Sequence, residues 1–241
     1  MSTDALDPDT ARIAAHLRDQ WDRLDRWLRD LGPGLERAAD DPSVLGGWTI
    51  GELVSHLGRA MDALAACSSV PPGTVPLTLA EYLGSYPGRA EEIGRFTRDL
   101  DAELAPDRVR GVEQLAAAAF VRLGELAGER VVQARRGPIT LRDMLVSRLV
   151  ELVVHADDLA RSFPSVVADP ADRGALDLVA DELLHVVVVR GGWSLEVHDP
   201  RLWVRLACGR EPYDVDQLAR ALVPVHTSDA VPDLGRMLPL L

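Results

Sequence analysis

The chain has 241 residues with 38 acidic and 26 basic side chains, which give a formal net charge of −12 at pH 7. This acidity argues against nucleic acid as a partner, because contact with a phosphate backbone needs a basic surface. Every basic residue is arginine, which excludes lysine-based Schiff-base chemistry and the lysine of a P-loop. With 47% hydrophobic and 27% charged residues, the composition is that of a globular protein with a buried core.

The cysteine content and the N-terminal sequence bear on the cellular compartment in which we expect the protein. Cys67 and Cys208 are too few for a disulfide framework and lack the spacing of a zinc finger. The N-terminal residues are polar and acidic, unlike a signal peptide, and no apolar run approaches the roughly 18 residues that span a membrane. We therefore expect a cytoplasmic protein with no membrane partner.

Two helices are clearly predicted in the first third of the chain. Apolar residues step by three and four positions from Ile13 to Leu31, which predicts a helix of about twenty residues ending at Gly32-Pro33-Gly34. The sequence Thr49-Ile50-Gly51-Glu52 matches a capping box and predicts the start of a second helix. This second helix carries His56 on the face that it should bury.

The middle of the chain is predicted to contain shorter helical stretches and one extended segment. A short helix starts at Thr78, is interrupted at Pro87 and resumes to about Leu104. Asp107 caps a further helix, and residues 129–138 form a short extended connector.

The next predicted helix is central to the fold. It opens at Thr140-Leu141-Arg142-Asp143 and is apolar on nearly all sides from Leu141 to Ala160. A helix of this kind is typical of the centre of a bundle. We therefore predict a mainly α protein in which residues 1–165 form a helical bundle.

Residues 166–241 differ in pattern from the preceding helical bundle and predict a small α/β domain. A helix is expected from about Pro170 to Val189, followed by strands at Trp193–His198 and Leu202–Cys208. Asp214 then caps a final helix that runs to Leu222.

A candidate metal site emerges from the pattern of buried polar residues. Glu151 and His155 are four positions apart, so both side chains leave one face of the central helix about 6 Å apart. A carboxylate among aliphatic residues is costly unless it is paired or bound to a cation. If His56 packs against this face, two imidazoles and one carboxylate form a three-ligand site with open coordination positions, as in catalytic metal centres. The spacing alone also allows a buried Glu–His pair beside a core histidine.

Two motifs carry a resemblance to a known family. The segments Gly47–Leu57 and Gly137–Leu159 resemble the mycothiol-dependent maleylpyruvate isomerase family, a branch of the DinB-like four-helix bundles. The resemblance covers roughly residues 10–162. It implies that His56, Glu151 and His155 bind a divalent metal, usually zinc, and that mycothiol serves as a thiol cofactor.

The C-terminal segments Asp199–Arg210 and Asp233–Leu241 resemble the end of a sterol-carrier-protein-like domain. The stretch from Gly192 to Asp199 is short, so a strand or loop of that domain is missing. The isomerase family places a catalytic arginine in its C-terminal domain. Arg205 and Arg210 are the candidates here, and each can also be interpreted as a structural or solvated arginine.

Three other side chains lie one helical turn from a proposed ligand. Arg59 and Arg148 are candidates for holding a cofactor or a substrate carboxylate, or for salt bridges across the bundle. Asp158 either orients an imidazole from outside the ligand set or is a surface residue near the helix end. Cys67 lies three turns beyond His56 and out of ligand range.

The resemblance implies a metal-binding enzyme that activates a low-molecular-weight thiol against an electrophilic substrate, as an isomerase or an S-transferase. Two alternatives keep the same residues: a metal-stabilised protein that binds a small molecule or lipid without catalysis, and a metal-dependent hydrolase that uses water. The sequence leaves open the substrate, the metal, the choice of thiol or water, and whether the shortened C-terminal domain retains catalytic residues. It also leaves open whether the chain is a monomer or a homodimer.

Overall fold

The computed structural model describes residues 6–105, 107–226 and 230–241. The helices are α1 (Pro8–Leu31), α2 (Pro33–Ala38), α3 (Ile50–Ala65), α4 (Leu79–Leu83), α5 (Ala90–Leu104), α6 (Arg108–Glu125), α7 (Leu141–Ser162), α8 (Arg173–Gly191), α9 (Pro200–Ala207) and α10 (Val215–Ala221). The strands are β1 (Ser68–Ser69), β2 (Val131–Ala134), β3 (Gly137–Thr140), β4 (Leu195–Val197) and β5 (Leu222–Pro224). The predicted mainly α fold class is confirmed.

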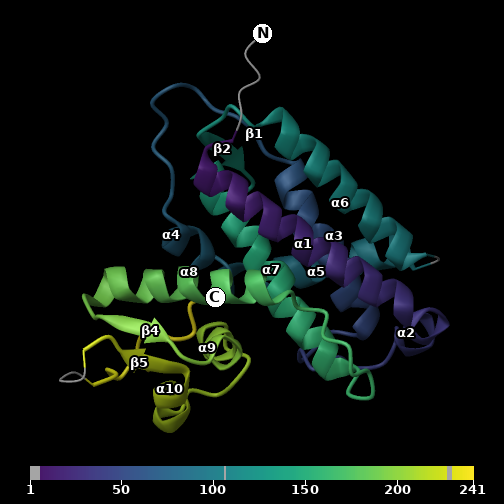
Figure 1. Cartoon of the computed structure of the whole chain (residues 1–241). Helices are drawn as coiled ribbons and strands as arrows, with labels where there is room; N and C mark the ends of the chain where they lie inside the picture. Colours follow the sequence, from purple (N-terminus) through teal and green to yellow (C-terminus); the bar gives the residue numbers. More distant parts are fainter. Residues whose placement is uncertain (1–5, 106, 227–229) are drawn as a thin grey trace.

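Helices α1, α3, α6 and α7 pack together as the bundle (Figure 1). As predicted, α7 is the central helix: residues 144–159 are all buried, and the helix contacts α1, α3, α4 and α8. Helix α3 lies very close to α6 at Gly58, where an added Cβ would be 2.8 Å from Leu115 and 3.0 Å from Val112. The absence of a side chain at Gly58 therefore allows this close approach.

The start of α3 is set by the predicted capping box. The Thr49 hydroxyl accepts a hydrogen bond from the Glu52 backbone N–H at 3.1 Å, and the Glu52 carboxylate accepts one from the Thr49 N–H at 3.0 Å. This cap fixes where the helix begins and hence the direction in which His56 points, two turns later.

The Thr49→Ala variant is expected to lower the free energy of unfolding by about 1 kcal/mol, because it leaves an N-terminal amide of α3 without its side-chain acceptor. Denaturant titration followed by circular dichroism measures this change. Thr49→Ser keeps the hydroxyl and serves as the control. Equal destabilisation by Thr49→Ser and Thr49→Ala would show that the cap is not what stabilises the helix.

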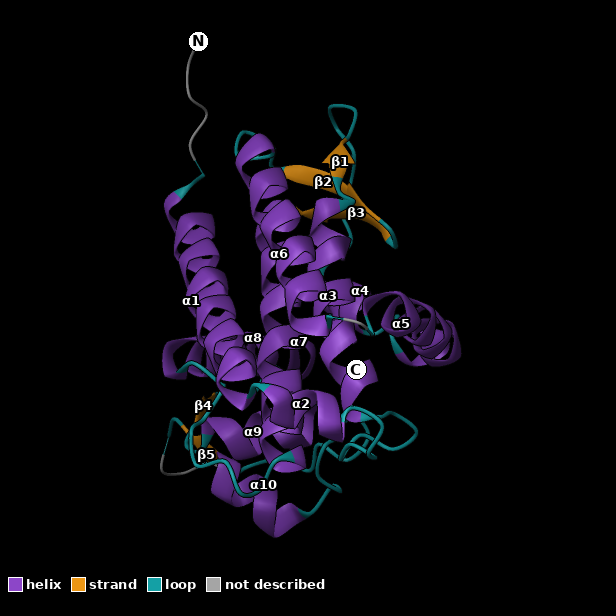
Figure 2. Cartoon of the chain, turned by 90° about the vertical axis from the view of Figure 1, so that its right-hand side faces the viewer, coloured by secondary structure: helices purple, strands orange, loops and turns teal. Residues whose placement is uncertain are grey.

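The predicted extended connector is a β-hairpin. Strands β2 and β3 pair antiparallel, with Val132 opposite Ile139, and residues 135–136 form the turn between them. Strand β1 pairs with the other edge of β2, so the sheet order is β1-β2-β3. The hairpin delivers the chain directly into the first turn of α7 (Figure 2).

The C-terminal part combines helices with a two-stranded antiparallel sheet of β4 and β5. The predicted strand Trp193–His198 is present as β4, but the predicted strand Leu202–Cys208 is wrong: these residues lie mostly in helix α9. The side chain of Asp199 caps this helix by accepting a hydrogen bond from the Leu202 N–H at 3.0 Å. Trp203 is completely buried on the helix face turned toward α8, where its indole N–H donates to the Ala180 carbonyl at 3.0 Å.

The C-terminal elements gather at one end of the bundle, where α8 packs on α7 and α1 (Figures 1 and 2). Ion pairs from α7 tie the two parts together. The buried carboxylate of Asp157 accepts hydrogen bonds from Arg201 and Arg205, both at 2.7 Å. No helix in the described ranges combines the length and the apolar character needed to cross a membrane.

Candidate metal centre

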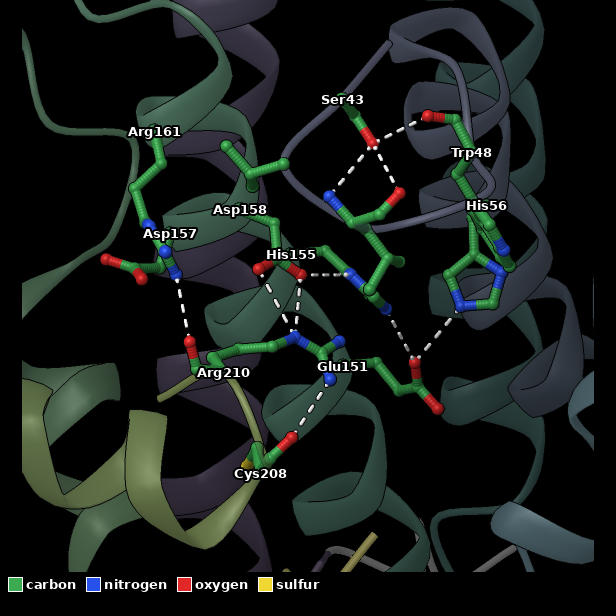
Figure 3. Close-up of polar contacts among 12 residues, drawn as sticks. Ser43, Trp48, His56, Glu151, His155, Asp157, Asp158, Arg161, Cys208 and Arg210 are labelled. Atoms are coloured by element: carbon green, nitrogen blue, oxygen red, sulfur yellow. Dashed lines mark hydrogen bonds and ion pairs between the residues drawn. The ribbon is translucent and has the colours of Figure 1, made fainter. Parts of the chain in front are cut away.

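The packing of α3 against α7 brings together three side chains that are far apart in the sequence. His56 comes from α3, and Glu151 and His155 come from successive turns of α7. The Nε2 atom of His56 lies 3.2 Å from Glu151 Oε2, and the Nε2 atom of His155 lies 3.3 Å from the same oxygen (Figure 3). All three donor atoms are within 4.8 Å of one another.

These distances fit a shared divalent cation. Two ligands of a tetrahedral zinc ion, each about 2.05 Å from the metal, lie about 3.3 Å apart. Both histidine–glutamate separations have this value within 0.1 Å. The three side chains are between 5% and 9% exposed, and buried carboxylates at such sites need a compensating cation or proton. The donor set of two imidazoles and one carboxylate suits a divalent metal with open coordination positions.

Each imidazole is oriented by a partner on its other nitrogen. His155 Nδ1 lies 3.0 Å from Asp158 Oδ2, and His56 Nδ1 lies 3.2 Å from the hydroxyl of Thr97 on α5. Because the Asp158 carboxylate can only accept a hydrogen bond, we infer that His155 Nδ1 carries a proton. In neutral His155 the lone pair of Nε2 then faces Glu151, as ligation requires.

The electrostatics of the site favour cation binding. Burial opposes ionisation of Glu151, but its contacts with both histidines and the charge of Arg148 outweigh burial and hold the pKa well below its ordinary value. Burial lowers the pKa of His56 to about 4, so the ring is neutral at pH 7. Glu151 and His56 are thus in the protonation states that ligate metals. For His155, burial is outweighed by hydrogen bonds to Asp158 and Glu151, which raise its pKa, so a cation would displace a proton there.

The three side chains face a cavity of about 360 Å³. The Trp48 ring borders it, with its centroid 4.8 Å from the His56 ring and 6.5 Å from the His155 ring. Tyr86 and Arg148 form another part of the wall. The Tyr86 hydroxyl accepts a hydrogen bond from the Arg148 guanidinium at 2.7 Å.

The predicted cofactor-binding arginines both line this cavity, in different states. Arg148 is buried and donates to the Ala60 carbonyl at 2.9 Å, and its Nη2 lies 3.9 Å from Glu151. It is therefore fixed beside the carboxylate. Arg59 has no carboxylate partner among the described residues.

Of the two candidates for a catalytic arginine, the fold places one at the cavity and one away from it. Arg210 lines the cavity, but its guanidinium contacts Asp158 at 3.1 Å and donates to the Cys208 carbonyl at 2.9 Å. Arg205 is engaged with Asp157 and is not among the residues that line the cavity. Asp158 itself is 1% exposed, so the interpretation as an orienting carboxylate holds and the surface interpretation is wrong.

Sequence reasoning missed several residues around the cavity. Thr97 contacts His56 only because α5 packs on α3, and no local pattern marks it. Arg135 and Arg136 stand at the hairpin turn and line the cavity, and their position before Gly137 was the one available signal of a turn. Trp48 was visible in the sequence as the residue before a capped helix, but its contact with both histidines depends on tertiary packing.

Comparison with known proteins assigns the bundle to a family. The family model of the mycothiol maleylpyruvate isomerase N-terminal domain matches residues 17–160, which is more than half of the chain and includes His56, Glu151 and His155. The match ends within α7, so the predicted sterol-carrier-like domain stays a prediction. No curated protein and no solved structure matches the chain. On this evidence, the chain belongs to the mycothiol maleylpyruvate isomerase N-terminal domain family.

Proposed function

We propose that the chain is a metal-dependent enzyme that acts with a low-molecular-weight thiol of the mycothiol type, as an isomerase or an S-transferase. The observation that carries the proposal is the convergence of His56, Glu151 and His155 at the wall of an open cavity, in a chain of this family. Three protein ligands leave coordination positions free, which is the arrangement of a catalytic rather than a structural zinc site. Zinc is the metal that we propose.

The ligands and their surroundings have separate tasks. His56, Glu151 and His155 would hold the cation, which when bound lowers the pKa of a coordinated thiol so that it is deprotonated at neutral pH. Arg148 keeps the carboxylate of Glu151 in position from the opposite side. The Trp48 ring lies beside both imidazoles at the cavity wall.

The state of the chain's own cysteines favours an external thiol. Burial raises the pKa of Cys67 to about 11 and that of Cys208 to about 12, so neither is a thiolate at neutral pH. Neither lines the cavity. A thiol nucleophile would therefore come from a small molecule that enters the cavity, with an electrophile as second substrate. The proposal places the protein in the cytoplasm, where small thiols remain reduced.

The proposal is tested first by elemental analysis of the purified protein and then by titration of the cobalt-substituted protein with a mycothiol-like thiol. We expect one metal per chain and a sulfur-to-cobalt charge-transfer band in the absorption spectrum. Metal without thiol binding would reject thiol dependence and favour a water-based hydrolase or a binding protein. A protein without metal would leave Glu151 and the two histidines as a buried hydrogen-bonded cluster and overturn the proposal.

A further inference from the structure

The charge of the cavity wall is opposite to that of the chain. The chain carries a net charge of −12, yet the side chains lining the cavity include one carboxylate, that of Glu151, and six arginine guanidinium groups. These arginines are Arg59, Arg89, Arg135, Arg136, Arg148 and Arg210. An excess of cations in a concave, partly enclosed space attracts anions from solution.

Most of these arginines are already neutralised. Four of them lie within 4.0 Å of a carboxylate, in the pairs Arg89–Glu92, Arg135–Asp62, Arg148–Glu151 and Arg210–Asp158. Within the described part of the chain, Arg59 and Arg136 have no such partner. The Nη1 atom of Arg136 is moreover buried without any hydrogen-bond acceptor. A buried donor in this state costs free energy that a bound acceptor would recover.

Arg136 is held in place by stacking on an aromatic ring. Its guanidinium lies over the Tyr86 ring, 3.7 Å from the centroid. The hydroxyl of the same tyrosine accepts a hydrogen bond from Arg148, which in turn approaches Glu151. Arg136 therefore faces the same cavity as the His–Glu–His cluster, with Tyr86 and Arg148 between them.

Arg59 adds a second uncompensated charge. It lies one helical turn after His56 on α3 and faces the cavity. Burial, together with the charges of Arg135 and Arg136, lowers the pKa of Arg59 below its ordinary value. The guanidinium nevertheless stays protonated at neutral pH, so these cations repel one another until an anion lies between them.

We propose that this cavity binds an organic anion and that Arg59 and Arg136 hold its carboxylate or phosphate group, while the reacting end reaches the His–Glu–His cluster. The planar guanidinium matches both anions with paired N–H donors. The inference names the substrate class of the proposed enzyme. The placement of the reacting end rests on the proposed function, whereas the anion site rests on the arginines alone. The anionic group belongs either to the thiol or to the electrophile.

The test is calorimetric titration with glutarate and with its uncharged dimethyl ester. We expect glutarate to bind and the ester not to, with an affinity that falls as salt is added. Arg136→Gln and Arg59→Gln should each weaken glutarate binding about tenfold, the loss typical of one hydrogen bond to a charged group. Arg89→Gln is the matched control: it lines the same cavity but is paired with Glu92 at 2.7 Å, so it should leave the affinity unchanged.

Equal binding of glutarate and its ester would overturn the anion site, as would equal losses in Arg136→Gln and Arg89→Gln. The titration is run with and without added zinc, so that its failure is distinguishable from failure of the proposed function. Glutarate binding by a protein that takes up no metal would retain the anion site and reject the enzyme. Metal and thiol binding without glutarate binding would retain the proposed enzyme and reject the anion site.

The source of the anion is assigned by titrating the cobalt-substituted protein with 6-mercaptohexanoate and with its methyl ester. Tighter binding of the acid, reversed by glutarate, would support the anion site and place the anionic group on the thiol. Simultaneous binding of the ester and glutarate would support the anion site and place the anionic group on the electrophile.

Discussion

The His155→Ala variant is expected to retain no stoichiometric metal while keeping most of its helical circular-dichroism signal. His155 supplies one of three protein donors, and its Nε2 lies 3.3 Å from Glu151. Removing a ligand should weaken metal binding by more than the roughly 10–100-fold lost when an outer partner of a ligand is removed. Elemental analysis after dialysis measures the metal per chain.

His185→Ala is the control for this variant, because the same substitution is made at an exposed histidine of α8, outside the cavity. It should keep the full metal content of the unmodified chain. Cys67→Ala should do the same, because that residue lies outside the ligand cluster. A His155→Ala protein with full metal occupancy would remove the three-residue site from consideration.

The Asp158→Asn variant is expected to lower metal affinity by roughly 10–100-fold without abolishing binding. The Asp158 carboxylate accepts a hydrogen bond from the His155 Nδ1–H at 3.0 Å and also contacts Arg210 at 3.1 Å. Asparagine preserves the shape but removes the charge that orients the imidazole and strengthens it as a ligand. Competition with a chromophoric chelator gives the dissociation constant.

Asp157→Asn is the matched control for Asp158→Asn. Asp157 is the neighbouring buried carboxylate on α7 and also binds arginines of the C-terminal part, but it does not touch the histidines. Its substitution should leave metal affinity unchanged, even if it loosens the contact between α7 and α9. Equal losses in the two variants would mean that any weakened ion pair at this end of α7 perturbs the site.

These contacts make the C-terminal part relevant to the candidate metal centre, although the family match does not extend to it. Arg210 reaches from the segment after α9 to Asp158, and Asp158 reaches His155. Arg210 therefore holds the carboxylate that contacts His155. The catalytic role that the resemblance implies for Arg205 or Arg210 stays a prediction.

Local features of the sequence determined most of the helical framework. The apolar stripe of α1, the capping box of α3 and the apolar character of α7 depend on residues within one or two turns, so periodicity and caps predicted them. The same holds for Glu151 and His155, whose four-residue spacing places them on one face of any helix. The error at 202–208 is also local: an apolar run interrupted only by Arg205 fits both a strand and a short helix, and burial of Trp203 against α8 decided for the helix.

The site itself was decided by tertiary structure. His56 meets Glu151, which is 95 positions further along the chain, because α3 and α7 pack side by side in the bundle. Thr97, Tyr86 and Arg136 reach the same cavity from other elements. The sequence alone thus determined the helices and one pair of candidate ligands. Only the packing decided which buried polar groups share a point in space, because such contacts depend on the crossing of distant helices and leave no periodic trace in the chain.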